Sequence, residues 1–491
     1  MSPWKDPESP PAEDRSSREG LWSPRHRALT VGLILTITLV AFEALAVSTI
    51  MPIVADELGG LELYGWVFTA FMLGSLVGIV VSGGLIDGRG LGRTFAGGIG
   101  LFAIGLVIGG LAPSMLILVF ARFVQGLGAG AIPPIAYVAI GRRLPERLRP
   151  QMFATLSTAW VLPGVIGPAI AGFIGETFDW RAVFLGLLPL IAVAALIAFP
   201  AIRLVGAPTT MVAAEAAASA SFRRRFPLAL LVAAGTGLFL AGLTSGQPLA
   251  MAALVVVGLV GALPALRALT PPGTLRAARG MPAAILTRGI LTFAFFGVDA
   301  YVALALVSGR GQSVTQAGLS LTAATLTWTA GSWVQAHFAG RYPPERFVRA
   351  GLAVAVLGLA AFGVVLIPTM SPWLAIPTFG LAGLGMGLAY APLTLIVLRD
   401  AEPGQQGSAS SALSLTDMLG TALGTGVTGA LVAASVRADG TVVSGLVAGF
   451  GVAIGVGLVG LGLSGRLAAA RPNDPTATSD HPRGRVRRLL R

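Results

Sequence analysis

The sequence predicts an all-α integral membrane protein with fourteen membrane-spanning helices, and its composition and apolar runs both point to that class. Hydrophobic residues make up 54% of the 491 residues, charged residues make up 11%, and the mean hydropathy is +0.80. Soluble domains contain about 25% charged residues. With so few charges, the chain lacks the polar surface that keeps a folded protein dissolved.

Long apolar runs give the number of spans. A helix needs about 20 mostly apolar residues to cross the hydrocarbon layer of a membrane. The runs are grouped as six, two and six, and they lie near 29–51, 65–86, 95–112, 115–140, 151–175, 181–202, 226–244, 248–267, 283–308, 314–339, 347–368, 372–398, 408–435 and 442–464. An alternative count merges the central pair into one re-entrant hairpin.

The charges between the runs predict the orientation. If the N-terminus is cytoplasmic, the arginine-rich segments all face the cytoplasm, and the outer segments hold only Arg181, Arg310 and Arg437. This is the positive-inside pattern of membrane proteins. We therefore expect both termini in the cytoplasm of a bacterial cell with the protein in its inner membrane, and Arg122 as the only basic residue within a span. The net charge of +12 then reflects orientation and not affinity for nucleic acid.

The grouping of the spans predicts two halves. We expect a cytoplasmic tail, a six-helix bundle, a linker that carries the two extra spans (about 226–267), a second six-helix bundle and a basic cytoplasmic tail, at 1–28, 29–202, 203–280, 281–465 and 466–491. The first span of each half carries one embedded acid, Glu43 or Asp299. Six-span halves with a site at their interface are typical of secondary transporters.

Missing residue types exclude several chemistries. The chain has no cysteine, so disulfides and thiolate metal sites are excluded. Its only lysine is Lys5, whereas a Walker phosphate-binding loop needs a lysine after its second glycine. His337 is the only histidine within a predicted span, too few for a membrane-embedded enzyme with clustered catalytic groups. We expect no enzyme activity, no metal, no cofactor, and transport driven by a gradient.

Four stretches resemble motifs of the major facilitator superfamily. Residues 83–93 (GGLIDGRGLGR) resemble its loop signature, and residues 122–130 (RFVQGLGAG) resemble its arginine motif. Residues 164–172 (GVIGPAIAG) are similar to the span 5 motif of drug:proton antiporters. Glu43, followed by residues 55–60 (ADELGG), resembles span 1 of the fourteen-span antiporters, which also have two extra central spans.

The resemblance implies a fold of two six-helix bundles plus two extra spans, and a proton-coupled antiporter that exports hydrophobic or cationic drug-like compounds. Multidrug efflux, antibiotic resistance and a monomer with protons, lipid and small substrates as partners are implied with it. Glu43 stands where an aspartate is usual, Leu45 replaces a threonine, and Ala339 replaces an acid. The alternative function is proton-coupled export of a lipid, siderophore or other metabolite on the same fold.

Charged residues inside the spans are the main candidates for a site, because an ionisable group in hydrocarbon is costly unless it is paired or hydrated. Glu43, Asp299 and Arg122 lie at similar depths, which predicts a shared water-accessible cavity. The proton affinity of a carboxylate depends on burial and on nearby charge. Glu43 and Asp299 are therefore candidates to carry the proton or the positive charge of the substrate in turn. The competing interpretation is a static Glu43–Arg122 pair that only positions helices.

Four more residues complete the predicted binding site: Gln125 beside Arg122, and the aromatic residues Tyr301, Trp160 and Trp328. Aromatic faces near an acid suit hydrophobic or cationic substrates, although core packing is the commoner role for any one of them. The alternating glycines of residues 126–130 lie inside a span and follow no strand. Close helix packing is therefore expected there and not a nucleotide-binding loop.

A charged loop between spans 2 and 3 is the predicted cytoplasmic latch. By the resemblance, Asp87 acts with Arg89 and Arg93 around Gly90 and meets the start of span 11; a solvated loop charge is the alternative. Asp417 in span 11 is either a titratable cavity residue or a charge at its inner end. The span 5 motif either bends during gating or only packs closely, through Gly164, Gly167, Pro168 and Gly172.

Overall fold

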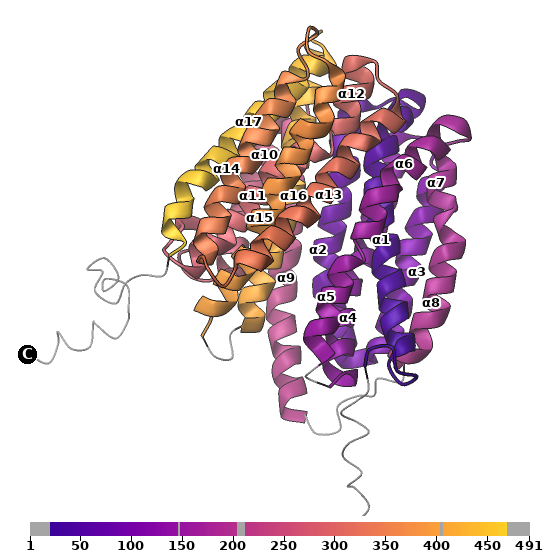
Figure 1. Cartoon of the computed structure of the whole chain (residues 1–491), viewed down its shortest axis with the longest axis vertical. Coiled ribbons are helices and arrows are strands. Elements are labelled where there is room, and N and C mark those ends of the chain that lie inside the picture. Colours follow the sequence, from indigo (N-terminus) through magenta and orange to yellow (C-terminus); the bar gives the residue numbers. More distant parts are fainter. Residues whose placement is uncertain (1–19, 146–147, 204–211, 403–405, 469–491) are drawn as a thin grey trace, which may run out of the picture.

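The computed structural model describes residues 20–145, 148–203, 212–402 and 406–468, which form helices and turns with no β-strand among them. Most helices run along the long axis of the molecule (Figure 1). Most of both predicted tails and part of the predicted linker, at 1–19, 469–491 and 204–211, lie outside the described residues.

Interruptions divide two of the predicted spans in the first half of the chain. The span at 151–175 is divided at Ala159, whose carbonyl accepts a 3.1 Å hydrogen bond from Thr38 Oγ1, and the span at 181–202 is divided at Gly186. The helices are α1 (Arg27–Leu58), α2 (Tyr64–Arg89), α3 (Leu91–Gly110), α4 (Met115–Arg143), α5 (Arg149–Thr158), α6 (Val161–Thr177), α7 (Arg181–Leu185) and α8 (Leu187–Arg203), with the short turn η3 (Leu61–Leu63).

One predicted span is interrupted in the second half, where the backbone leaves the helix between Asp299 and Val302. Ser313 then starts α13 with a capping box, in which Ser313 and Gln316 bond each other's backbone N–H. The helices are α11 (Met281–Asp299), α12 (Val302–Arg310), α13 (Val314–Phe338), α14 (Pro344–Val364), α15 (Ala375–Asp400), α16 (Gln406–Arg437) and α17 (Val442–Leu463), with the short turns η6 (Pro372–Leu374) and η7 (Ser464–Arg466).

The central pair consists of α9 (Val212–Thr244) and α10 (Pro248–Leu269), followed by the turn η5 (Thr274–Arg276). Helix α9 begins well before the predicted run at 226–244, so 223–225 belongs to this helix and not to a polar linker. It packs on α10 and also on α2 and α16, one helix from each half. The apolar cluster at this junction contains Leu73, Leu76, Ala229, Val232, Ala233, Leu419 and Ala422.

Twelve helical segments of the described residues are long and apolar enough to cross a membrane, so the chain is a multi-pass membrane protein. Two predicted spans are missing from this set. The first is 151–175, where the interruption leaves only the 17-residue α6. The second is 314–339, where α13 is 25 residues long but rich in threonine and serine. These hydroxyls bond the preceding turn, as Thr329 Oγ1 does to the Thr325 carbonyl at 3.0 Å. The count of fourteen therefore remains a prediction.

The same pattern of helix packing occurs in both halves. Helix α4 packs on α2 and α3, and α15 packs on α13 and α14. Helix α1 packs on α6 and α8, and α11 packs on α16 and α17. We interpret this recurrence as two related bundles, with the boundaries at 29–202 and 281–465 that the sequence suggests.

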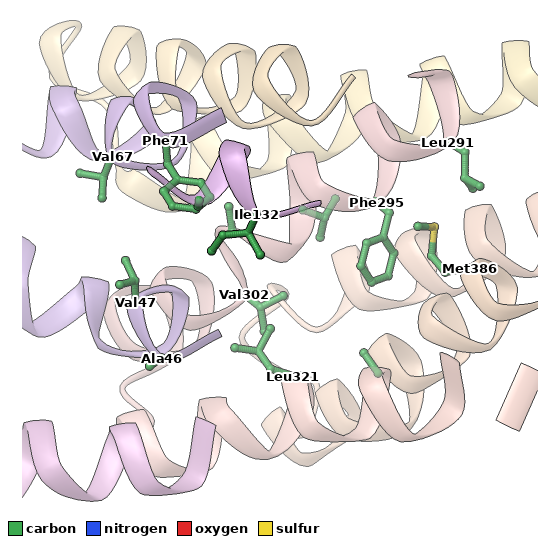
Figure 2. Close-up of a cluster of buried hydrophobic side chains, with 14 of the residues drawn as sticks. Ala46, Val47, Val67, Phe71, Ile132, Leu291, Phe295, Val302, Leu321 and Met386 are labelled. Atoms are coloured by element: carbon green, nitrogen blue, oxygen red, sulfur yellow. The ribbon is translucent and has the colours of Figure 1, made fainter. Parts of the chain in front are cut away.

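In the described part of the chain the two halves meet mainly along four helix pairs, α2 with α16, α6 with α13, α1 with α12 and α1 with α13. An apolar core lies between them (Figure 2). It combines side chains of α1, α2 and α4 with side chains of α11 to α13 and α15, among them Val47, Phe71, Ile132, Phe295, Leu321 and Met386.

Candidate functional site

A buried ion pair joins α1 to α4. Glu43 Oε1 and Arg122 Nη1 form a salt bridge, and the two side chains are 1% and 2% exposed. Gln125, one turn further along α4, accepts a 2.9 Å hydrogen bond from Arg122 Nη1 and donates one of 3.3 Å to Glu43 Oε1. The structure thus brings three of the predicted site residues into one network.

Helix α2 holds the rest of the Arg122 guanidinium. Its Nε donates to the Val67 carbonyl at 3.3 Å, and its central carbon lies 4.3 Å from the centre of the Phe71 ring. The second carboxylate oxygen of Glu43, Oε2, is buried and has no hydrogen-bond partner among the described residues. A carboxylate can accept hydrogen bonds at both oxygens. One carboxylate oxygen of Glu43 is therefore without a hydrogen bond in the described part of the chain, and its use by a proton or a positively charged ligand stays a prediction.

Glycines allow the helices around this pair to approach closely. A β-carbon on Gly126 would overlap the Phe71 carbonyl of α2, and one on Gly128 would overlap the backbone of Phe102 in α3. Gly130 faces α2 again, one turn further on. Because alternate glycines serve two neighbouring helices, the prediction of close packing in this motif is confirmed.

Asp299 lies at the break between α11 and α12. It is the last residue of α11, it is half-buried, and within the described part of the chain it has no hydrogen bond or ion pair. The structure therefore does not join it to the Glu43 network. Interrupted helices carry ion and substrate sites in many transporters, so its position keeps Asp299 a candidate.

The predicted aromatic residues occupy three different environments. Tyr301 is fully buried, and its hydroxyl donates to the Thr425 carbonyl of α16 at 2.7 Å. Its ring packs against Tyr64 and Phe68 of α2 in the contact between the halves, which is the core-packing role that the sequence also allowed. Trp160 is 47% exposed at the break before α6. Trp328 is half-buried, and its ring centre lies 5.3 Å from that of Tyr390 on α15.

A second charged network, which the sequence analysis missed, lies in the second half. Arg288 of α11 donates from Nε to Asp417 Oδ1 of α16 at 2.9 Å and from Nη1 to the Tyr390 carbonyl at 2.5 Å. The Tyr390 hydroxyl donates to Asp417 Oδ2 at 2.9 Å. Arg288 was predicted to face the cytoplasm. It is instead buried inside a predicted span. An arginine and an aspartate in the predicted runs 283–308 and 408–435 were the available signal.

The predicted latch residues lie where α2 gives way to α3. Asp87 and Arg89 are in the last turn of α2, and their side chains lie outside the described part of the structure. Gly90 has a φ angle of 81°, which favours glycine, and Arg93 is exposed in the first turn of α3. Asp417 lies on α16. It is in the buried network with Arg288, so the latch role of all these residues stays a prediction.

The span 5 motif lies along the contact between α6 and α13. A β-carbon on Gly164 would overlap the side chain of Thr325. Three motif residues face α13, namely Gly164 toward Thr325, Pro168 toward Gly318 and Gly172 toward Thr315. Gly167 faces Phe42 of α1 instead. The motif therefore lies in the close contact between α6 of the first half and α13 of the second half.

Glu176 extends this contact at the end predicted to face outside. Its Oε1 accepts hydrogen bonds from the backbone N–H groups of Val314 and Thr315, at 2.6 and 3.3 Å, and its Oε2 accepts one from Thr315 Oγ1 at 2.7 Å. A carboxylate is stabilised at a helix N-terminus by the helix dipole. Glu176 therefore caps α13 from the opposite half of the protein.

A bundle of apolar spans with ion pairs buried between them is the architecture of a solute transporter. The chain belongs to the Major Facilitator Superfamily, whose family model matches residues 33–425. This confirms the resemblance to the superfamily, whereas the fourteen-span antiporter subfamily stays a prediction. Because this is a family of transporters, it also agrees with the prediction that the protein is not an enzyme.

Curated relatives include a probable multidrug-efflux transporter of Mycobacterium tuberculosis, 26% identical over 461 residues, which cover 91% of this chain and 97% of the relative. The methylenomycin A resistance protein of Streptomyces coelicolor is 27% identical over 427 residues, 84% of this chain and 86% of the relative. An uncharacterized MFS-type transporter of Mycobacterium tuberculosis is 27% identical over 447 residues and 87% of this chain. This chain spans only 62% of that relative's length.

Solved structures show the same fold at low sequence identity. The nucleoside transporter NupG has a TM-score of 0.65 and 12% identity, with 90% of this chain and 99% of that chain covered. A POT family transporter in complex with a thioalcohol conjugated peptide has a TM-score of 0.65 and 16% identity, with 90% and 97% covered. These similarities establish the fold and leave the substrate open.

Proposed function

We propose that the protein is a proton-coupled antiporter that exports hydrophobic or cationic drug-like compounds by alternating access. The observation that carries this proposal is the buried Glu43–Arg122–Gln125 network with its one unbonded carboxylate oxygen. The names of the multidrug-efflux and methylenomycin A resistance relatives support the class of substrate.

The location of Glu43 gives this network a route to couple binding and movement. Helix α1 contacts α6 and α8 of its own half and also α12 and α13 of the other half. A change in the charge of Glu43 alters its attraction to Arg122 in surroundings where charge pairs are poorly screened. Alternating access requires two arrangements of the halves, one open to the inside and one open to the outside. Protonation of Glu43, or binding of a cation to it, then shifts the equilibrium between these two arrangements.

In this scheme Glu43 and Asp299 carry the proton or the positive charge of the substrate in turn, one in each half. No cofactor takes part, because the proton gradient supplies the energy. We further propose a monomer in a bacterial cell membrane, with both termini in the cytoplasm and fourteen spans. In this proposal the packing of Tyr301 against Tyr64 of α2 and the hydrogen bonds of Glu176 to the start of α13 hold the two halves together at the predicted outer end.

The test is transport of a panel of dyes into proteoliposomes under an imposed pH gradient. Wild-type protein, Glu43→Gln and Asp299→Asn are compared side by side, and an ionophore that collapses the gradient is the control. Wild type is expected to accumulate at least one hydrophobic cation, and Glu43→Gln is expected to lose that accumulation. If the gradient drives no member of the panel in wild type, proton-coupled drug export is the wrong function.

A further inference from the structure

The Arg288–Asp417 network has a geometry that the scheme above does not use. The Arg288 guanidinium lies 3.0 Å from the centre of the Tyr390 ring and bonds one oxygen of Asp417. The Tyr390 hydroxyl bonds the other oxygen. A cation above an aromatic face and beside a carboxylate is how proteins recognise organic cations. Arg288 thus occupies a cation-binding position built from α15 and α16.

Further aromatic side chains extend this position into an apolar wall. The ring centre of Trp328 on α13 lies 5.3 Å from that of Tyr390 and 6.4 Å from that of Phe296 on α11. All three side chains are half-buried. Partly exposed aromatic faces beside a carboxylate provide both apolar contact and charge attraction for a bulky cation.

A polar face of α16 connects Asp417 to the inner end of the helix. Ser411 and Ser414 are exposed and lie six and three residues before Asp417, so the three residues share one face of the helix. Exposed hydroxyl and carboxylate groups within a membrane-spanning helix favour contact with water over lipid. The Asp417 side chain is 24% exposed and that of Arg288 is 6% exposed, so Asp417 is the partner within reach of a solute.

We propose that Asp417, Tyr390 and Trp328 form a subsite for organic cations, and that Arg288 is an internal cation which the substrate displaces from Asp417. The proposal rests on the proposed function only in taking cations as substrates. Arg288 keeps its bond to the Tyr390 carbonyl when it leaves Asp417, so its charge is not left without a partner. The subsite is separate from the Glu43 network, which lies in the other half.

Opposite effects of two substitutions distinguish this subsite from a pair that only positions helices. The measurement is equilibrium binding of radiolabelled tetraphenylphosphonium to the purified full-length protein, without a pH gradient. Asp417→Asn is expected to weaken binding about tenfold, because it removes the charge that attracts the cation. Arg288→Gln is expected to strengthen binding about tenfold, because it removes the competing cation. Arg399→Gln, which breaks the ion pairs of an exposed arginine with Glu345 and Asp400, is the control and leaves binding unchanged.

A structural pair predicts that both substitutions weaken binding, and that result overturns the proposal. If Asp417→Asn does not fold, the direction of the Arg288→Gln change decides alone, because tighter binding supports the subsite and weaker or unchanged binding overturns it. A wild type that does not bind the cation also overturns it. None of these outcomes depends on proton coupling. The dye assay can therefore refute the proposed function without refuting this subsite, and the binding assay can refute the subsite without refuting the proposed function.

Discussion

Glu176→Gln is predicted to loosen the outer contact between α6 and α13. The carboxylate of Glu176 accepts three hydrogen bonds from Val314 and Thr315 at the start of α13, and these bonds cross from one half to the other. An amide in the same place keeps one acceptor oxygen, but it loses the negative charge and one of the two acceptor atoms.

The size of the effect follows from this geometry. A carboxylate at a helix N-terminus contributes about 0.3–1 kcal/mol when exposed, and Glu176 is exposed. The substitution also removes one charge-assisted hydrogen bond, which water partly replaces. Together these losses destabilise the closed arrangement relative to the open one by about 1 kcal/mol. A difference of this size shifts a two-state equilibrium about fivefold toward the arrangement that is open at this end.

Cysteine labelling measures that shift, because the natural chain has no cysteine. Thr322 of α13 is half-buried, and its hydroxyl donates to the Val165 carbonyl of α6 at 3.4 Å, so Thr322→Cys reports opening of this contact. A water-soluble thiol reagent is expected to react about five times faster in the Glu176→Gln background. Glu62→Gln, an exposed glutamate at the same end with no hydrogen bond to α13, is the control. Equal labelling rates in the two backgrounds show that Glu176 does not hold this contact closed.

Three further predictions concern helix packing and the buried ion pair. Gly164→Ala forces a β-carbon into Thr325 and is expected to cut proton-driven dye transport by tenfold or more, since overpacking costs about 1–3 kcal/mol. The control Gly167→Ala, whose β-carbon makes only ordinary contact with Phe42, is expected to keep the wild-type transport rate. Equal transport rates in the two variants contradict the prediction. Gly128→Ala, which overlaps the α3 backbone, is expected to lower the unfolding temperature of the detergent-solubilised protein, whereas Gly97→Ala, with open space, leaves it unchanged. Glu43→Gln and Arg122→Gln each break the buried ion pair and are expected to lower the free energy of unfolding by about 3–5 kcal/mol. The double variant is expected to be less destabilised than either single variant, and thermal unfolding measures all three. Losses that add in the double variant show that the two side chains do not interact.

Much of the first-half network could be predicted from the sequence, because charged residues in long apolar runs are few. Glu43 and Arg122 stand out on that ground alone, and Gln125 lies one turn from Arg122. Arg288 was overlooked because it lies near the start of its run, where an arginine is expected at the cytoplasmic boundary. Its burial depends on Asp417, which is far away in the sequence.

The helix interruptions could not be predicted, because long-range contacts accompany them. Thr38 of α1 bonds the Ala159 carbonyl at one break, and Tyr301 bonds the Thr425 carbonyl at another. Hydropathy alone does not decide whether α13 is a span, because threonine and serine lower the apolar character of the helix while their hydroxyls bond its own backbone. The burial of Tyr301 between the halves could not be predicted either, because it depends on contacts with α2, which is distant in the sequence.

Substrate-induced proton release tests most directly whether Glu43 carries the proton. Purified protein in weakly buffered detergent solution is mixed with a saturating hydrophobic cation, and a pH indicator records the protons that leave the protein. Wild type is predicted to release protons on binding, because the cation and the proton compete for the same carboxylate, and Glu43→Gln is predicted to release none. Undiminished release from a folded Glu43→Gln variant contradicts the claim that Glu43 carries the proton.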